Sequence, residues 1–286
     1  MTEQIVYLNG EFLPLSEAKI SVLDRGFIFG DGVYEVIPAY GKNLFRFKEH
    51  IVRLNNSLAG IRLNLSKSEH EWLEVITELM DKNEGIDQSI YLHITRGVAP
   101  RDHGFPKDDN QATIFAMSNP LLPQPEYIKE KGVVAVTLAD NRWSNCHIKA
   151  ISLLANILLR QEALEQNAQE AILIKDGHAT EGAASNLFIV QDQVIKTPAK
   201  SSELLPGITR DLIVELANNH QLSIEEAEIL ESDLIKADEI WLTSSTKEIL
   251  PVTKLNEKML SQGKPGPVWA QMMGFYQAYK ENLRNK

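Results

Sequence analysis

A single lysine between two apolar stretches is the residue in this chain best suited to covalent chemistry. Lys149 lies in the segment Asn145-Cys146-His147-Ile148-Lys149-Ala150, after the apolar run of residues 132–138 and before the aliphatic run of residues 151–159. A lysine normally keeps its ammonium group in water, so these flanks need an explanation. Taken alone, the segment favours a surface lysine at a strand-to-helix corner. The alternative is a desolvated lysine with a lowered pKa, able to form a Schiff base with a carbonyl compound.

Two later segments could bind an anion. The segment Leu204-Leu205-Pro206-Gly207-Ile208-Thr209-Arg210 opens a predicted helix, and the free N–H groups of such a helix start bind phosphate. Four consecutive hydroxyl residues, Thr243-Ser244-Ser245-Thr246, follow a predicted strand and could form a second phosphate clamp. The same composition is also common in ordinary turns.

A carboxylate and a basic loop complete the set of candidate residues. Glu181 is the only carboxylate in the small-residue connection of residues 178–186. The loop of residues 96–106 carries Arg96, Arg101 and His103, and loops with such residues often recognise anions. The plain alternative is a polar surface loop.

Together these features favour one cofactor, pyridoxal 5′-phosphate. A lysine holds its aldehyde, a carboxylate keeps its ring nitrogen protonated, and amides and hydroxyls hold its phosphate. Each feature alone is a weak signal, but the phosphate sites and Glu181 are hard to explain without a cofactor anchored at a lysine. They therefore reverse the interpretation of Lys149 that its own segment favours.

The order of these motifs resembles that of the fold-type IV (class IV) pyridoxal-phosphate aminotransferases along nearly the whole chain. The most specific motif is Ala179-Thr180-Glu181-Gly182-Ala183-Ala184-Ser185-Asn186-Leu187-Phe188. The resemblance implies that Lys149 is the catalytic residue and holds the cofactor. It also implies that the other cofactor-binding residues are Glu181 at the ring nitrogen, Arg53, Leu205, Ile208, Thr209, Ser244 and Ser245. The hydroxyl that contacts the phosphate stays open among Ser244, Ser245 and Thr246.

The loop after residue 95 carries the signature of the D-amino acid subgroup of that family, Arg-Gly-x-x-Pro-Arg-x-His, from Arg96 to His103. By this resemblance Tyr34, Arg101 and His103 bind the substrate carboxylate. Arg101 and His103 would come from the neighbouring subunit of a homodimer. A guanidinium offers two parallel donors to a carboxylate, which agrees with that role.

The implied reaction is a ping-pong transamination between a D-amino acid, such as D-alanine or D-glutamate, and a 2-oxo acid, such as 2-oxoglutarate or pyruvate. Lys149 would move the proton from the substrate Cα. Alternatives of the same fold are an aminodeoxychorismate lyase, a branched-chain L-amino acid aminotransferase and an R-amine transaminase. A cysteine hydrolase built on Cys146 is disfavoured, because His147 is its direct neighbour and points to the opposite face of an extended segment. The seven histidines show no paired metal-ligand spacing, so we expect no metal.

Composition agrees with this interpretation. Of 286 residues, 43% are hydrophobic and 24% are charged, which is typical of a soluble globular protein. The net charge of −10 argues against nucleic-acid or anionic-membrane partners. One cysteine excludes an intrachain disulfide and fits the cytoplasm. The residues at the N-terminus show no secretory signal, and no apolar run reaches membrane-spanning length.

The pattern of elements predicts a two-domain α+β or α/β fold. We expect a small α+β domain at 1–118, an interdomain linker at 119–128 that contains three prolines, and a larger cofactor-binding domain at 129–286 with a β-barrel-like core. The last feature comes from the resemblance alone. In the first domain we predict a hairpin around Asn9-Gly10, an irregular glycine-rich loop with close backbone approaches at 24–32, and a strand at 33–40. Helices are predicted at 47–61 and 68–83, the second with a capping box at Ser68 and Glu71, and strands at 88–95 and 112–118. The 47–61 helix carries Arg53 on a face that we would expect to be solvated unless a site lies nearby.

In the second domain we predict strands at 132–138, 171–175, 186–190 and 239–242. Helices are predicted at 152–166, from about 208 to 219, and from 267 to 282, where a proline suits the first turn.

Overall fold

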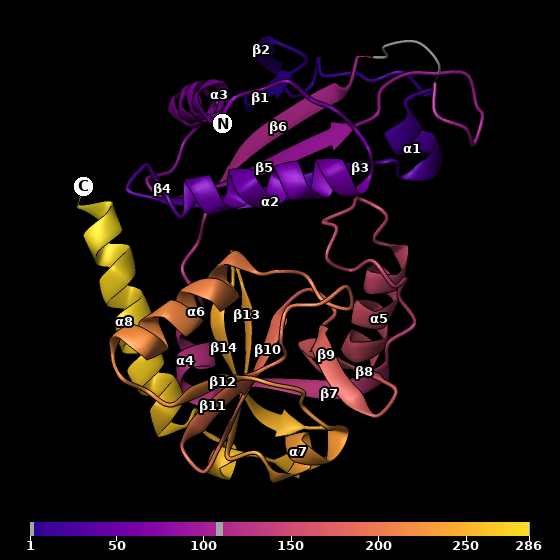
Figure 1. The fold of residues 1–286 in the computed structure, drawn as a ribbon. Helices are drawn as coiled ribbons and strands as arrows, with labels where there is room; N and C mark the ends of the chain where they lie inside the picture. Colours follow the sequence, from indigo (N-terminus) through magenta and orange to yellow (C-terminus); the bar gives the residue numbers. More distant parts are fainter. Residues whose placement is uncertain (1–2, 107–110, 286) are drawn as a thin grey trace. The chain divides into compact units, whose positions relative to one another are not determined.

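The computed structural model of the chain describes residues 3–106 and 111–285, and these fall into two compact units (Figure 1). The first unit contains the described residues up to Leu122, the short segment Ile148–Ser152 and the residues from Leu283 onward. The second contains Pro123–His147 and Leu153–Asn282. The domain limits predicted above, 1–118 and 129–286, include residues 1–2, 107–110 and 286, which lie outside the described part, and they stay a prediction.

The first unit is an antiparallel sheet covered on one face by two helices. The strand order is β2-β1-β6-β5-β3-β4. The strands are β1 (Ile5–Leu8), β2 (Glu11–Pro14), β3 (Gly32–Tyr40), β4 (Asn43–Leu44), β5 (Gln88–Thr95) and β6 (Thr113–Pro120). The helices are α1 (Arg25–Phe29), α2 (Phe47–Gly60) and α3 (Glu69–Asp81).

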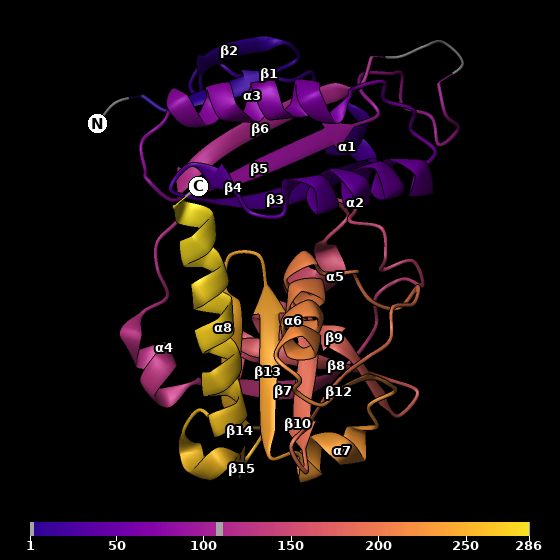
Figure 2. The same cartoon turned by 60° about the vertical axis from the view of Figure 1, so that its left-hand side comes forward.

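Apolar periodicity explains why α2 and α3 pack on this sheet (Figure 2). Ile51 and Leu54 of α2 and Trp72 and Ile76 of α3 are buried in one cluster with Ile37 and other inward residues of the sheet. The predicted capping box at the start of α3 is confirmed, because Ser68 and Glu71 cap each other's backbone. The hairpin at Asn9-Gly10 is confirmed as well, with both residues at positive φ.

The second unit is a mixed nine-stranded sheet that curls into a half-barrel, so that β9 lies beside β10. The strand order is β12-β11-β10-β13-β14-β7-β8-β9, with β15 paired to β14. The strands are β7 (Val133–Ala139), β8 (Glu170–Lys175), β9 (His178–Gly182), β10 (Asn186–Gln191), β11 (Val194–Thr197), β12 (Ile224–Glu226), β13 (Glu239–Ser244), β14 (Glu248–Leu255) and β15 (Lys258–Met259). The predicted fold class, with a small α+β part and a larger part on a barrel-like sheet, is confirmed.

The helices associated with the second unit include the three that the sequence predicted there. The helices associated with this unit are α4 (Glu126–Lys131), α5 (Leu154–Glu165), α6 (Ile208–Asn219), α7 (Glu231–Lys236) and α8 (Pro267–Arg284), together with a 3₁₀ turn at Ser261–Gly263. The predicted ones are α5, α6 and α8. Buried Glu239 accepts hydrogen bonds from the backbone of Val268 and Trp269 and so fixes the start of α8. Across the described residues, no helix combines the length and the apolar character needed to cross a membrane.

Two sequence predictions were wrong in detail. The glycine-rich segment at 24–32 is not wholly irregular, because α1 forms there with Asp24 as its N-cap. The close backbone approach predicted for this segment is present: a Cβ on Gly26 would lie 2.2 Å from Thr95 Cγ2. The segment at 178–186, predicted as a connection, contains strand β9. Its small residues have low β-propensity, so the sequence pattern did not indicate a strand there.

Candidate active site

Lys149 lies in the first unit, on the short segment that pairs with the edge of β3. Its carbonyl accepts a hydrogen bond from Tyr34 N at 3.0 Å, and its own N–H donates to Ser57 Oγ of α2 at 3.1 Å. The side chain is half-buried, and Nζ lies 3.9 Å from the centroid of the Tyr34 ring. Within this unit, as far as it is described, no carboxylate pairs with the ammonium group. A lysine fixed in this way is less hydrated than a surface lysine.

A buried charge cluster lies on the helix-covered face of the same sheet. Arg53 of α2 donates from Nε and Nη2 to the two carboxylate oxygens of Glu35 on β3, at 2.8 and 2.7 Å. His50 Nδ1 lies 2.8 Å from Glu35 Oε2. Burial would raise the pKa of Glu35, but Arg53 and His50 outweigh it and hold that pKa far below its ordinary value. Arg53 is therefore not on a solvated face.

The same cluster leaves one buried acceptor. Burial lowers the pKa of His50, so its ring is neutral at pH 7. An ionised Glu35 can only accept, so His50 carries its hydrogen on Nδ1. Within the described part of the chain, His50 Nε2 is buried and has no hydrogen-bond partner.

Two buried arginines, Arg25 and Arg96, fix the loop that follows β5. Asp31 accepts from Arg25 Nε at 2.8 Å and from Arg96 Nε and Nη2 at 2.8 and 3.0 Å. Arg25 Nη1 also donates to the carbonyls of Asp102 and Gly104, at 2.6 and 3.2 Å. Arg96 is thus structural, although the sequence placed it among residues of an anion-binding loop.

Arg101 and His103 are both exposed in that loop, and both pack against Phe29. The Arg101 guanidinium lies 5.6 Å from the Phe29 ring centroid, and the His103 ring lies 5.4 Å from it. Their polar ends are open to solvent. The loop therefore presents two cationic or donor groups outward from a rigid base.

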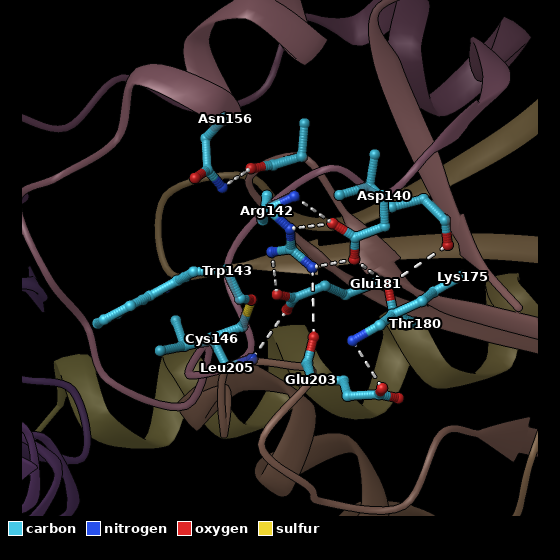
Figure 3. Close-up of polar contacts among 12 residues, drawn as sticks. Asp140, Arg142, Trp143, Cys146, Asn156, Lys175, Thr180, Glu181, Glu203 and Leu205 are labelled. Carbon is cyan, nitrogen blue, oxygen red and sulfur yellow. Dashed lines mark hydrogen bonds and ion pairs between the residues drawn. The ribbon is translucent and has the colours of Figure 1, made fainter.

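Glu181 lies in the second unit, buried on β9, in a network of fixed donors (Figure 3). Oε1 accepts from Arg142 Nη1 at 2.5 Å, and Oε2 accepts from Leu205 N at 3.1 Å and Asn186 Nδ2 at 3.2 Å. Burial raises the pKa of Glu181 to about 7, against the opposing effect of Arg142. A carboxylate with such a pKa needs a further positive charge to be fully ionised at neutral pH.

Asn186 joins Glu181 to the start of α6. Its Nδ2 also donates to the carbonyl of Leu205 at 2.8 Å. A Cβ on Gly207, the N-cap of α6, would lie 1.8 Å from Asn186 Oδ1, so only glycine fits there. Ile208 and Thr209 form the buried first turn of α6, which has no side-chain cap. Its amide N–H groups are therefore available to an anion.

The hydroxyl cluster begins on β13 beside the same corner, because Asn186 pairs with Thr243 in the sheet. Thr209 Oγ1 and Thr243 Oγ1 are both buried, and among the residues that the structure describes neither has a hydrogen-bond partner. Ser244 is half-buried and accepts from Lys247 N at 3.3 Å, and Ser245 lies in the turn that follows. The sequence singled out Ser244 and Ser245, but within the described residues the hydroxyl of this cluster that is buried without a partner belongs to Thr243.

Sequence reasoning missed the partners of its key residues. Arg142 and Asp140 flank Glu181 but lie about forty residues before it in the chain, with no motif of their own. Glu35 and His50 were visible only as members of periodic elements. An ionisable residue at a buried position would have been the signal for them, but only the folded structure shows which positions are buried.

The cysteine hydrolase alternative loses support from this geometry. Burial raises the pKa of Cys146 to about 11, and its thiol donates to the carbonyl of Trp143 at 3.1 Å. Such a thiol is a poor nucleophile at neutral pH. In residues 3–106 and 111–285, no group of three or more His, Cys, Asp or Glu side chains could hold a metal ion.

Comparison with known proteins gives one consistent result. The family model described as "Amino-transferase class IV" matches residues 32–255. The chain is 40% identical to a D-alanine aminotransferase of Bacillus licheniformis over 264 residues, which cover 92% of each protein. It is 38% identical to a D-alanine aminotransferase of Staphylococcus aureus strain N315 over 277 residues, covering 97% of this chain and 98% of that protein.

Solved structures agree at the level of the fold. The crystal structure of the Escherichia coli branched-chain amino acid aminotransferase superposes with a TM-score of 0.89 at 28% identity, covering 97% of this chain and 94% of that one. A fold IV transaminase of Curtobacterium pusillum gives a TM-score of 0.81 at 22% identity, covering 94% of this chain and 92% of that one.

Proposed function

The chain belongs to the class IV aminotransferases, and we propose that it transfers the amino group of a D-amino acid, such as D-alanine, to a 2-oxo acid. Two curated relatives that share 38–40% of its residues over more than nine-tenths of its length carry the name D-alanine aminotransferase. The subgroup signature from Arg96 to His103 supports the same substrate class.

The residues present fit pyridoxal 5′-phosphate, the cofactor of this family. The supporting observations are the buried, unpartnered hydroxyls of Thr209 and Thr243, the uncapped start of α6, and Glu181 with acceptor capacity in reserve. The observation that carries the proposal is Glu181: a buried carboxylate held by fixed donors suits a protonated ring nitrogen.

We assign the cofactor-holding roles as follows. Lys149 holds the aldehyde carbon through Nζ, and Glu181 accepts the hydrogen of the ring nitrogen. The amides of Ile208 and Thr209 bind the phosphate, with hydroxyls at residues 243–245 and the positive charge of Arg53 in support. Leu205 orients Glu181 through its backbone N–H, as it does already in this structure.

When bound, this cofactor withdraws electrons from the substrate Cα and so makes its hydrogen acidic. The free amine of Lys149 would take the Cα proton as the general base. Tyr34 lies beneath Nζ and limits the directions from which it can approach. Arg101 and His103 bind the substrate carboxylate, and this contact decides which face of Cα is presented to Nζ.

We also propose a homodimer in which Arg101 and His103 complete the partner's active site. Within the first unit, Val22, Leu23 and Phe27 expose 71%, 46% and 70% of their surface. Ala99, of the same loop as Arg101, bonds through its N–H to the Leu23 carbonyl. An exposed apolar group next to outward-facing substrate residues suits contact with a second copy. The single, buried Cys146 supports the proposal of a cytoplasmic protein.

The decisive experiment is an activity screen of the purified protein loaded with pyridoxal phosphate. D-alanine with 2-oxoglutarate should yield pyruvate and glutamate. L-alanine, branched-chain L-amino acids and R-amines should react at least about tenfold more slowly, as expected when a fixed carboxylate contact is misaligned. Turnover of the L-substrates alone would favour the branched-chain alternative, and pyruvate release from aminodeoxychorismate without any 2-oxo acid would favour the lyase.

A further inference from the structure

The carboxylate of Glu181 has almost all of its acceptor positions filled. It accepts from Arg142 at Oε1 and from Leu205 N at Oε2 (Figure 3). Oε2 also accepts from Asn186 Nδ2. An ionised carboxylate offers about four acceptor positions. About one position is therefore left for a ligand, and the three donors define where it points.

Arg142 is itself held by a second carboxylate. Its Nε and Nη2 donate to the two oxygens of Asp140 at 2.9 and 2.8 Å, and Nη2 also donates to the Glu203 carbonyl at 3.3 Å. Asp140 in turn accepts from the hydroxyl of Thr180 at 3.0 Å. The planar guanidinium is thus fixed on one side by Asp140, and its remaining arm, Nη1, is directed at Glu181.

The charges of this trio do not cancel. Arg142 contributes one positive charge, while ionised Asp140 and Glu181 contribute one negative charge each, and their side chains are 4–6% exposed. Arg142 opposes the rise in the pKa of Glu181 that burial causes. The trio therefore lacks one positive charge, which matches the single charge of a protonated ring nitrogen.

We propose that Arg142, oriented by Asp140, is a positioning residue that favours the ionised form of Glu181 and reserves its last acceptor position for the protonated ring nitrogen of the cofactor. This inference rests on the proposed function, since it assigns a new residue to the same site. Asp140 acts one step further away, by fixing the guanidinium. Neither residue belongs to a sequence motif.

The test uses the full-length protein reconstituted with pyridoxal phosphate labelled with ¹⁵N in the ring. The ¹⁵N chemical shift reports whether the ring nitrogen carries a proton, and a parallel titration gives the dissociation constant of the cofactor. In Arg142→Met the shift should move toward the unprotonated value, and the dissociation constant should rise about tenfold, as for a lost charged hydrogen bond. In Arg142→Lys the ring nitrogen should stay protonated while the affinity for the cofactor falls. The positive charge remains, but lysine cannot make the several directed hydrogen bonds of the planar guanidinium.

A double-mutant cycle separates positioning from general damage. In a Glu181→Gln background, Arg142→Met should change the dissociation constant less than twofold, because its target is absent. If Arg142→Met alone folds poorly because Asp140 and Glu181 both lose their partner, Arg142→Lys keeps the charge beside them, so the inference stays testable. Lys175→Met is the matched control: Lys175 pairs with the Glu203 side chain at 2.9 Å in the same network, and its loss should leave the ¹⁵N shift unchanged.

The outcomes are distinct. Equal effects of Arg142→Met with and without Glu181, or a fully protonated nitrogen in folded Arg142→Met, would overturn the inference and leave the proposed function standing. A wild-type protein that binds no labelled cofactor would overturn the proposed function, and this inference with it.

Discussion

Arg53 holds both carboxylate oxygens of Glu35, at 2.8 and 2.7 Å, inside the first unit. The arginine lies on α2 and the glutamate on β3, so this pair ties the helix to the sheet. The arginine that the resemblance assigned to the cofactor is thus already anchored by a carboxylate, which fixes its direction.

The first prediction concerns this pair. Glu35→Gln should lower the free energy of unfolding by about 3 kcal/mol at pH 7, because it leaves a buried guanidinium without its counterion. The folded-state pKa of Glu35 lies below its ordinary value of 4.5. Its contribution is therefore present above pH 4.5 and disappears as the pH falls through the folded-state pKa. Urea unfolding at several pH values measures both effects.

Glu74→Gln is the control for this comparison. Glu74 is exposed on α3 and pairs only loosely with His70, at 3.4 Å. Its substitution should change stability by no more than about 0.5 kcal/mol. An equal fall in the free energy of unfolding for Glu35→Gln and Glu74→Gln would show that the buried pair stabilises the protein no more than the exposed one.

The second prediction concerns Lys149. Lys149→Ala should reduce turnover of D-alanine by at least about 10³-fold, because it removes both the proposed anchor of the cofactor and the proposed base. Folding should persist, since the backbone bonds to Tyr34 and Ser57 do not need the side chain. Steady-state kinetics and thermal unfolding measure the two effects, and Lys42→Ala in the same unit serves as control. Near-normal turnover in Lys149→Ala would refute the mechanism.

The sequence predicted those parts of the fold in which local signals agree. The 3.6-residue apolar period gave α2, α3 and α6, and the capping residues Ser68 and Glu71 placed the start of α3. Strand β5, at Gln88–Thr95, matched its prediction residue for residue. In α5 the helix was correct, but Leu154 and Ile157, which indicated it, are exposed, while Leu159 and Ala163 are buried.

The candidate site was only partly accessible from the sequence. Motifs indicated Lys149 and Glu181 as candidates because the proposed chemistry requires those residue types. They could not identify Arg142 or Glu35, since an ion pair depends on which strand and loop come together across long stretches of chain. Nor could they show that segment 148–152 groups with the first unit, although both of its flanks belong to the second.

The third prediction concerns Cys146. Because burial raises its pKa to about 11, the thiol should react with an aromatic disulfide reagent at pH 8 at least about tenfold more slowly in the folded protein than in urea. Cys146→Ser should retain transaminase activity. Rapid labelling of the native protein with loss of activity would revive the hydrolase alternative.

The fourth prediction concerns Asp31. Asp31→Asn removes the negative charge that orients Arg25 and Arg96. Arg25 should then no longer hold its hydrogen bonds to the carbonyls of Asp102 and Gly104. We expect KM for D-alanine and for the 2-oxo acid to rise about tenfold, with a smaller fall in kcat, because the proposed role of the loop is to bind substrate and not to do chemistry.

Stability should fall as well in Asp31→Asn, by about 3 kcal/mol, as for other buried pairs. Hydrogen bonds from Arg96 and Arg25 lower the pKa of Asp31 against the effect of burial, so this loss should shrink in acid. Asp81→Asn, at an exposed pair with Lys42, is the matched control. A folded Asp31→Asn enzyme with unchanged KM values would separate the loop from substrate binding.

The last prediction tests whether Arg101 serves the neighbouring subunit. Arg101→Ala and Lys149→Ala should each be nearly inactive as homodimers. If Arg101 acts in the partner's site, a mixed dimer contains one site with both residues intact. Random mixing makes half of the dimers mixed, so co-refolded subunits should recover about one quarter of wild-type activity. If Arg101 acts within its own subunit, every site lacks one residue and mixing recovers nothing. Activity measured against the ratio of the two variants, with sedimentation to confirm the dimer, decides between these arrangements.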